Sequence, residues 1–325
     1  MEKYSFYGRL SPLFPSQVIV DVTNVCNLEC VSCTHPEKIR QTGYKPVFLS
    51  QELNKKMVDE TKKLGDGITQ YIRYTADGEP LLHPQINDIL EYACLYSGTN
   101  VVLTTNGTLL DYMAGERLLD MGLLFVDISI DAFSKEIYRR IRRKGNFENV
   151  HDNVMNLIKM KKIKKSKTKI VVSFVEQEFN ANEKQNFKEY WENNGVDYVV
   201  IRRLHSYAGN KSEIADKLRL GILNRTPCVY PWERIVLKFN GFLTFCPGCP
   251  GDVKLADYRT TSIKKIWDSD FYNGLRHAHM INNFHGYDLC ANCPDWQLIR
   301  WPDEGRSYAD LISDFNDTPQ IVKQK

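Results

Sequence analysis

Residues 25–33, VCNLECVSC, decide how the rest of this chain is interpreted. Their three cysteines, Cys26, Cys30 and Cys33, have the spacing C-x3-C-x2-C and follow an apolar run at 18–22 that is typical of a strand. Three thiolates so close together can bind three irons of a 4Fe–4S cluster and leave the fourth iron open to a small molecule. Zinc is the alternative, but zinc normally takes four ligands in paired C-x2-C units, and the fourth is missing here. We therefore predict an open-iron cluster at these cysteines.

The triad resembles that of the radical S-adenosylmethionine (SAM) superfamily. The resemblance implies that the open iron binds the amino and carboxylate groups of SAM. It also implies that one electron from the cluster cleaves SAM to a 5′-deoxyadenosyl radical, which abstracts a hydrogen atom from the substrate. SAM and a 4Fe–4S cluster are thus the first expected cofactors.

A second motif of the same family follows a predicted strand. Asp77, Gly78, Glu79 and Pro80 are similar to its Gly-Gly-Glu-Pro loop, with Asp in place of the first Gly. In the family this loop binds the amino group of SAM through backbone carbonyls and the glutamate. The resemblance therefore implies that these four residues contact SAM.

Further resemblances concern the ribose and the adenine of SAM and an arginine that contacts SAM. Ser129 and Asp131 are similar to the Ser-x-Asp pair that binds the ribose, and the segment 138–147 resembles the one that carries a SAM-contacting arginine, here Arg142. One position departs from the pattern. The residue before the third cysteine is usually aromatic and lies near the adenine, but in this chain it is Ser32.

Apolar runs rich in β-branched residues alternate with amphipathic segments along the first two thirds of the chain. The predicted strands are 17–23, 71–75, 100–104, 124–130, 169–175 and 197–202, and the predicted helices include 50–63, 84–94, 147–162 and 183–194. Strands that alternate with helices form a parallel sheet, so we predict an α/β fold, a partial (β/α)6 TIM-like barrel. Such proteins place their sites at the carboxyl ends of strands, where the motifs above and Asn106 all stand. Asn106 is therefore a further expected SAM contact.

A second group of cysteines lies in the last third of the chain, at Cys228, Cys246, Cys290 and Cys293. The layout resembles the SPASM and Twitch extensions of radical SAM enzymes, which hold auxiliary 4Fe–4S clusters. Because no cysteine follows Cys293, the resemblance implies a Twitch-type module with one auxiliary cluster bound by these four residues. A zinc ribbon is the alternative, since C-x2-C pairs also suit zinc.

Motifs and composition together predict how the chain is divided into segments and where in the cell it is found. We predict an N-terminal segment at 1–16, the partial barrel at 17–215, a small α+β SPASM/Twitch-like module at 216–300 and a C-terminal tail at 301–325. No window has the apolar length of a membrane span, and no secretory signal is visible. Nine cysteines without export favour metal or redox chemistry in the cytoplasm over disulfides. A net charge of +3 does not favour a nucleic-acid partner.

The predicted core and auxiliary module cover most of the chain, from about residue 17 to about residue 296. In its single auxiliary cluster the chain resembles enzymes that oxidise 2-deoxy-scyllo-inosamine, which implies oxidation of a carbinol of a sugar or aminocyclitol, with the auxiliary cluster accepting an electron. A peptide substrate, epimerised or cross-linked, is one alternative, and a non-catalytic iron–sulfur electron carrier is another. Glu79, Ser129 and Asp131 argue against a carrier, which needs no SAM site. A flavodoxin or ferredoxin is the expected reducing partner.

The candidates for direct catalysis are Arg202, Arg203 and Cys249, with Glu176, Glu178 and Asp77 as rival candidates for taking the alcohol proton. Arg202 and Arg203 end the last predicted barrel strand, and only one of them can face the barrel interior because strand side chains alternate. An arginine is a poor base at its usual pKa, so orienting a hydroxyl or holding an anion is an equally valid role. Cys249 stands in a second C-x2-C with Cys246 and is open to three roles: an alternative ligand, a spare thiol or a hydrogen donor.

Overall fold

The computed structural model describes residues 10–75, 77–219, 225–249 and 253–298. The predicted tail at 301–325 lies outside the described residues, as do the first nine residues of the predicted N-terminal segment. In the described part of the chain, no helix is both long enough and apolar enough to cross a membrane.

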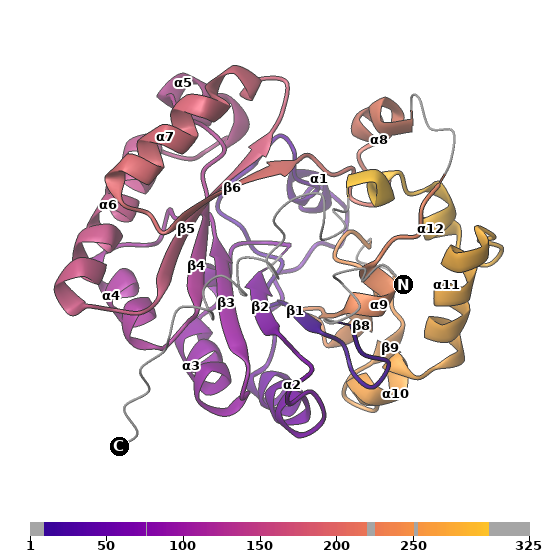
Figure 1. Cartoon of the computed structure of the whole chain (residues 1–325). Coiled ribbons are helices and arrows are strands. Elements are labelled where there is room, and N and C mark those ends of the chain that lie inside the picture. Colours follow the sequence, from indigo (N-terminus) through magenta and orange to yellow (C-terminus); the bar gives the residue numbers. More distant parts are fainter. Residues whose placement is uncertain (1–9, 76, 220–224, 250–252, 299–325) are drawn as a thin grey trace, which may run out of the picture.

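The α/β partial barrel is confirmed. All six predicted strands are present and parallel: β1 (Gln17–Asp21), β2 (Tyr71–Thr75), β3 (Asn100–Thr105), β4 (Phe125–Ser129), β5 (Lys169–Glu176) and β6 (Tyr198–Arg203). Helices cover the outer face of this curved sheet (Figure 1): α2 (Gln51–Leu64), α3 (Ile86–Tyr96), α4 (Tyr112–Asp120), α5 (Lys135–Ile141), α6 (Phe147–Lys164) and α7 (Lys184–Asn194). The right-handed β-α-β crossover explains why the strands stand in sequence order, β1 to β6.

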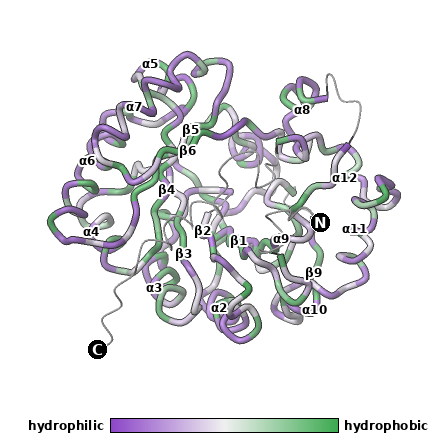
Figure 2. The backbone as a smooth tube through the Cα atoms, viewed as in Figure 1, coloured by the Kyte–Doolittle hydropathy of each residue, from purple (hydrophilic) through white to green (hydrophobic). Residues whose placement is uncertain are grey.

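Alternation along each strand divides the apolar residues into two groups. Outward-facing side chains pack under the helices in the main core, whereas the inward-facing ones form a smaller cluster inside the barrel: Ile19, Tyr71, Val102, Phe125, Val171, Val200 and Val236. Green, hydrophobic stretches accordingly run along strands such as β4 and β5 in the backbone trace (Figure 2). The inner cluster fills one end of the barrel and leaves the carboxyl ends of the strands for polar residues.

The C-terminal module continues the barrel sheet. Strand β7 (Arg234–Leu237) pairs in parallel with β1 on the side opposite β2, and β8 (Phe242–Thr244) and β9 (Ala256–Asp257) add antiparallel strands. Short helices surround these strands: α8 (Ser212–Arg219), α9 (Tyr230–Glu233), α10 (Ile263–Trp267), α11 (Asp270–Ile281) and α12 (Asp288–Asn292). The module therefore lies beside the barrel opening (Figure 1) and shares its sheet.

Candidate active site

The three core cysteines lie on the loop after β1, just before the short helix α1 (His35–Lys38). All three are half-buried free thiols. The backbone N–H of Leu28 donates to the sulfur of Cys26 at 3.4 Å, and that of His35 to the sulfur of Cys33 at 3.3 Å. Hydrogen bonds to the sulfurs are typical of the surroundings of an iron–sulfur cluster.

The loop of residues 77–80 lies directly against the cysteine loop. A Cβ atom on Gly78 would stand 2.0 Å from the backbone oxygen of Val25, so only glycine permits this approach. The N–H of Glu79 donates to the same oxygen at 2.7 Å. The two loops that the sequence assigned to the cluster and to SAM are therefore fixed to each other through the backbone.

Glu79 is buried and joins the ends of two strands. Its carboxylate accepts from Thr105 Oγ1 at 2.6 Å, from the backbone N–H of Asn106 at 2.7 Å and from that of Leu81 at 3.1 Å. Burial raises the pKa of Glu79 despite these donors. The carboxylate thus orders the ends of β2 and β3, and Asn106 extends the contact by donating through Nδ2 to the Asn27 side chain at 2.9 Å.

Asp131 and Arg142 form a buried pair beside the cysteines. Asp131 has a left-handed backbone, φ 64°, and accepts from Arg142 Nη2 at 2.6 Å. Arg142 Nη1 in turn lies 3.6 Å from the sulfur of Cys30. Burial opposes the charge on Arg142, but Asp131 and Cys30 raise its pKa, so the net shift is upward. Ser129, at the end of β4, lies 3.4 Å from the hydroxyl of Ser173 on the neighbouring strand.

A charged network that the sequence did not reveal lies at the carboxyl ends of β1 and β7. Lys238 is 4% exposed and forms ion pairs with Asp21 and, at 3.0 Å, with Asp77. Lys38 contacts Asp77 as well, at 3.1 Å. Burial raises the pKa of Asp77, but Lys238 and Lys38 together lower it by more than burial raises it. The net shift of the pKa is therefore downward. The aspartate that departs from the family motif is therefore a partner of a buried lysine.

The four auxiliary cysteines gather in the C-terminal module, and all four line one cavity. The N–H of Gly248 donates to the sulfur of Cys246 at 3.3 Å. Burial raises the pKa of Cys290 and of Cys293 to about 12, so these thiols favour the protonated form until a metal ion binds. Among the described residues, no three His, Cys, Asp or Glu side chains converge as they would around one metal ion. Four thiolates around one cavity form a ligand set that suits a 4Fe–4S cube, in which each thiolate binds its own iron.

Cys249 lies apart from this cavity. It is 2% exposed, packs with Trp267 and Tyr272, and its thiol interacts with that of Cys246. This placement does not favour its prediction as a hydrogen donor to a substrate.

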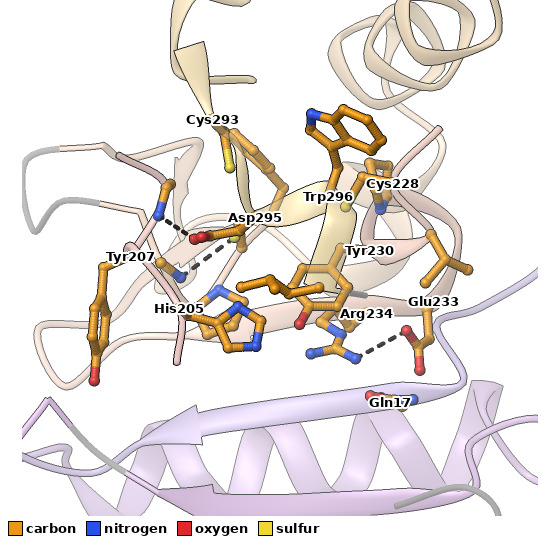
Figure 3. A pocket seen from close by; sticks show the side chains of 18 of the residues that line it. Gln17, His205, Tyr207, Cys228, Tyr230, Glu233, Arg234, Cys293, Asp295 and Trp296 are labelled. Atoms are coloured by element: carbon orange, nitrogen blue, oxygen red, sulfur yellow. Dashed lines mark hydrogen bonds and ion pairs between the residues drawn. The ribbon is translucent and has the colours of Figure 1, made fainter. Parts of the chain in front are cut away.

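The cavity that the auxiliary cysteines line reaches Ser32 in the core cysteine loop and has a volume of about 450 Å³. Its wall includes Ser32, beside the third core cysteine, and Arg202, which pairs with the fully buried Asp127 at 2.7 Å (Figure 3 shows the auxiliary side). Arg202 is thus the arginine that faces the barrel interior, whereas Arg203 is exposed at the rim. The half-buried ring of His205 also lines the cavity, and burial lowers its pKa. No spacing pattern marks His205 in the sequence, so it was not predicted.

Comparison with known proteins agrees with this geometry. The family described as the radical SAM superfamily matches residues 20–178, and an iron–sulfur cluster-binding domain, SPASM, matches residues 228–294. The class of protein is therefore an α/β-barrel enzyme that uses iron–sulfur chemistry. The chain belongs to the radical SAM superfamily, with SAM and 4Fe–4S clusters as its cofactors.

Curated relatives are named as cyclases. GTP 3′,8-cyclase of Lactiplantibacillus plantarum is 30% identical over 252 residues, which is 74% of this chain and 70% of the relative. GTP 3′,8-cyclase of Desulforamulus reducens is 34% identical over 142 residues, 43% of this chain and 42% of the relative. The chain thus matches less than half the length of the second relative, and its substrate is not fixed by these names.

Solved structures with the same fold hold different bound molecules. The structure of BtrN in complex with AdoMet and 2-DOIA has a TM-score of 0.56 and 17% identity, and the match covers 86% of this chain and 92% of BtrN. Streptococcus suis SuiB bound to its precursor peptide SuiA has a TM-score of 0.64 and 12% identity, covering 95% of this chain and 75% of SuiB. At these identities the likeness shows the fold alone.

Proposed function

We propose that this radical SAM enzyme oxidises a carbinol of a small molecule, a sugar or an aminocyclitol, to a carbonyl. The observation that carries the proposal is that one cavity is bordered by Ser32 at the core triad and by all four auxiliary cysteines. A substrate in this cavity lies within reach of both cysteine sites. Four protein thiolates satisfy a cube, so the auxiliary site suits electron transfer better than substrate binding.

The core site is assigned as follows. Cys26, Cys30 and Cys33 hold the core cluster, while residues 77–80, Asn106, Ser129, Asp131 and Arg142 surround SAM. When bound, SAM and the two clusters supply hydrogen-atom abstraction and an acceptor for the remaining electron. The chain itself must position the alcohol and take up its proton.

Two cavity residues suit that task. Arg202 is held in place by its ion pair with Asp127 and donates to the alcohol oxygen or to an anionic group of the substrate. His205, with its pKa lowered chiefly by burial, is neutral at pH 7 and can accept the proton. All nine cysteines are free thiols, which is consistent with the reducing cytoplasm and with reduction by a flavodoxin or ferredoxin.

The test is anaerobic incubation of the reconstituted protein with SAM, a reductant and three substrates: 2-deoxy-scyllo-inosamine, GTP and a synthetic peptide. With 2-deoxy-scyllo-inosamine we expect 5′-deoxyadenosine together with a product whose mass is lower than that of the substrate by two hydrogens. An isomer of unchanged mass would contradict oxidation, and deuterium uptake from heavy water would then indicate epimerisation. A protein that binds zinc and never forms 5′-deoxyadenosine would overturn the assignment of the core site.

A second candidate is nucleotide cyclisation, which the names of the relatives favour. Five arginines line the cavity and would suit a phosphorylated substrate: Arg73, Arg202, Arg203, Arg225 and Arg234. The GTP arm of the experiment separates the two candidates.

A further inference from the structure

The loop that follows β6, residues 206–211, joins the two cysteine sites. On the auxiliary side, Asn210 Nδ2 donates to the backbone oxygen of Gly248 at 3.3 Å, next to Cys246. On the core side, Lys211 forms an ion pair with Glu37 of α1, the helix that follows Cys33. The loop therefore contacts the immediate neighbours of both proposed clusters.

This loop has an unfavourable backbone at two consecutive residues. Tyr207 and Ala208 both adopt left-handed conformations, with φ of 54° and 57°. Residues with a Cβ atom rarely adopt this region, and two in a row need outside support.

Asp295 supplies that support. One oxygen of its carboxylate accepts from the backbone N–H and from the hydroxyl of Ser206, each at 2.7 Å, and the other accepts from the N–H of Ala208 at 2.8 Å. Asp295 is 7% exposed and stands two residues after Cys293. The two oxygens thus hold the residues on either side of Tyr207 (Figure 3), and the support comes from the auxiliary cysteine segment.

The Tyr207 side chain extends from the loop toward the core site. It is half-buried and lines the cavity together with Ser32. Burial raises the pKa of Tyr207, and among the groups whose charges act on its phenol are Cys33 and Cys30. Its hydroxyl makes no hydrogen bond to another residue in the described ranges.

We propose that Tyr207 is a SAM-contacting residue whose ring covers the purine base of SAM, and that Asp295 is the positioning residue that holds it there. The inference rests on the proposed SAM site at the core triad. Purine bases bind well against aromatic rings, and Ser32 offers no ring beside the third cysteine. The affinity for SAM therefore depends on a residue of the auxiliary cysteine segment.

The experiment measures SAM binding to the anaerobically reconstituted full-length protein by equilibrium dialysis. Replacing Tyr207 by Ala should weaken binding by about 5- to 150-fold, the range expected for loss of one base–aromatic stack. Tyr207→Phe keeps the ring and should bind within about twofold of the natural protein. Tyr112→Ala is the matched control, because Tyr112 is 60% exposed on α4 and should leave binding unchanged.

The positioning role is tested by a double-mutant cycle. Asp295→Asn cannot accept from both sides of Tyr207 and should weaken SAM binding, but it should have little further effect in the Tyr207→Ala protein. Ser206→Ala, which removes one of the three contacts, should act in the same direction but less, and the iron content of each variant shows whether its clusters are retained. Equal SAM affinity of Tyr207→Ala and natural protein, or strict additivity in the cycle, would overturn the inference alone. A natural protein that binds no SAM would overturn the proposed function, and this inference with it.

Discussion

Lys238, which directly follows β7, is a buried charged residue at the end of a strand. Its ammonium group is almost fully buried and contacts carboxylates from two other segments, Asp21 and Asp77. A buried charge is tolerated only when it is paired, and removal of one partner leaves the other uncompensated. The network therefore fixes the end of β7 to the end of β1 and to the loop that carries Gly78 and Glu79.

We expect Lys238→Met to lower the free energy of unfolding by about 3–5 kcal/mol, because Asp21 would remain buried without its cation. Urea unfolding under anaerobic conditions measures the change. The double variant Lys238→Met with Asp21→Asn should recover part of the loss, since the uncompensated carboxylate is then gone. A loss below about 1 kcal/mol would show that water or a neighbouring group compensates Asp21.

A second residue-scale prediction concerns Gly78. Because a Cβ atom there would overlap the backbone of Val25, Gly78→Ala should push the cysteine loop away from the 77–80 loop. The iron content after reconstitution should then fall from about eight to about four per chain, as the core cluster is lost. Gly122→Ala is the control: its φ of 85° also strains an alanine, but nothing surrounds it, so stability alone should suffer. Full iron content in Gly78→Ala would contradict the prediction.

At the scale of elements, helix α11 contributes Tyr272, Leu275 and Ala278 to the buried part of the C-terminal module. Its N-cap is Ser269, whose hydroxyl accepts from the N–H of Tyr272 at 3.3 Å and donates to the carbonyl of Ile266 at 2.7 Å. We expect Ser269→Ala to cost about 1 kcal/mol of stability and Ser269→Gly less than that, because glycine tolerates the N-cap backbone. Thermal unfolding of the three proteins gives the order, and equal stability of all three would contradict a capping role.

The elements also show what the sequence reveals and what it conceals. The barrel strands were predictable because each has at least five residues and is rich in β-branched and aromatic residues. Ser50 was recognisable as an N-cap, which it is for α2. Strands β7, β8 and β9 have four, three and two residues. These lengths are too short for an alternation of apolar and polar residues to be recognised in the sequence. The cysteine spacings identified both proposed cluster sites. The roles of Lys238 and Asp295 depend on pairing between distant segments, and no local pattern encodes such pairing.

At the scale of the whole molecule, the two cysteine sites belong to different segments of the sheet and should load independently. The variant in which Cys26, Cys30 and Cys33 are all replaced by Ala should retain about four irons, and natural protein should hold about eight. Iron analysis after anaerobic reconstitution tests this. Zinc in place of iron at the remaining site, or complete loss of metal in the triple variant, would contradict two separate clusters.

The pairing of β1 with β7 has a consequence for how this chain is made. Ser16, just before β1, donates to the carbonyl of Glu233, 217 residues further along the chain. During synthesis on the ribosome, one edge of β1 stays unpaired until β7, its neighbour in the sheet, has been made. An unpaired apolar strand edge can pair with another chain and so promote aggregation. Contacts between residues that are distant in the sequence also form slowly. The nascent chain is therefore most prone to aggregation before β7 has been synthesised, and a chaperone that covers the edge of β1 would be most useful during that time.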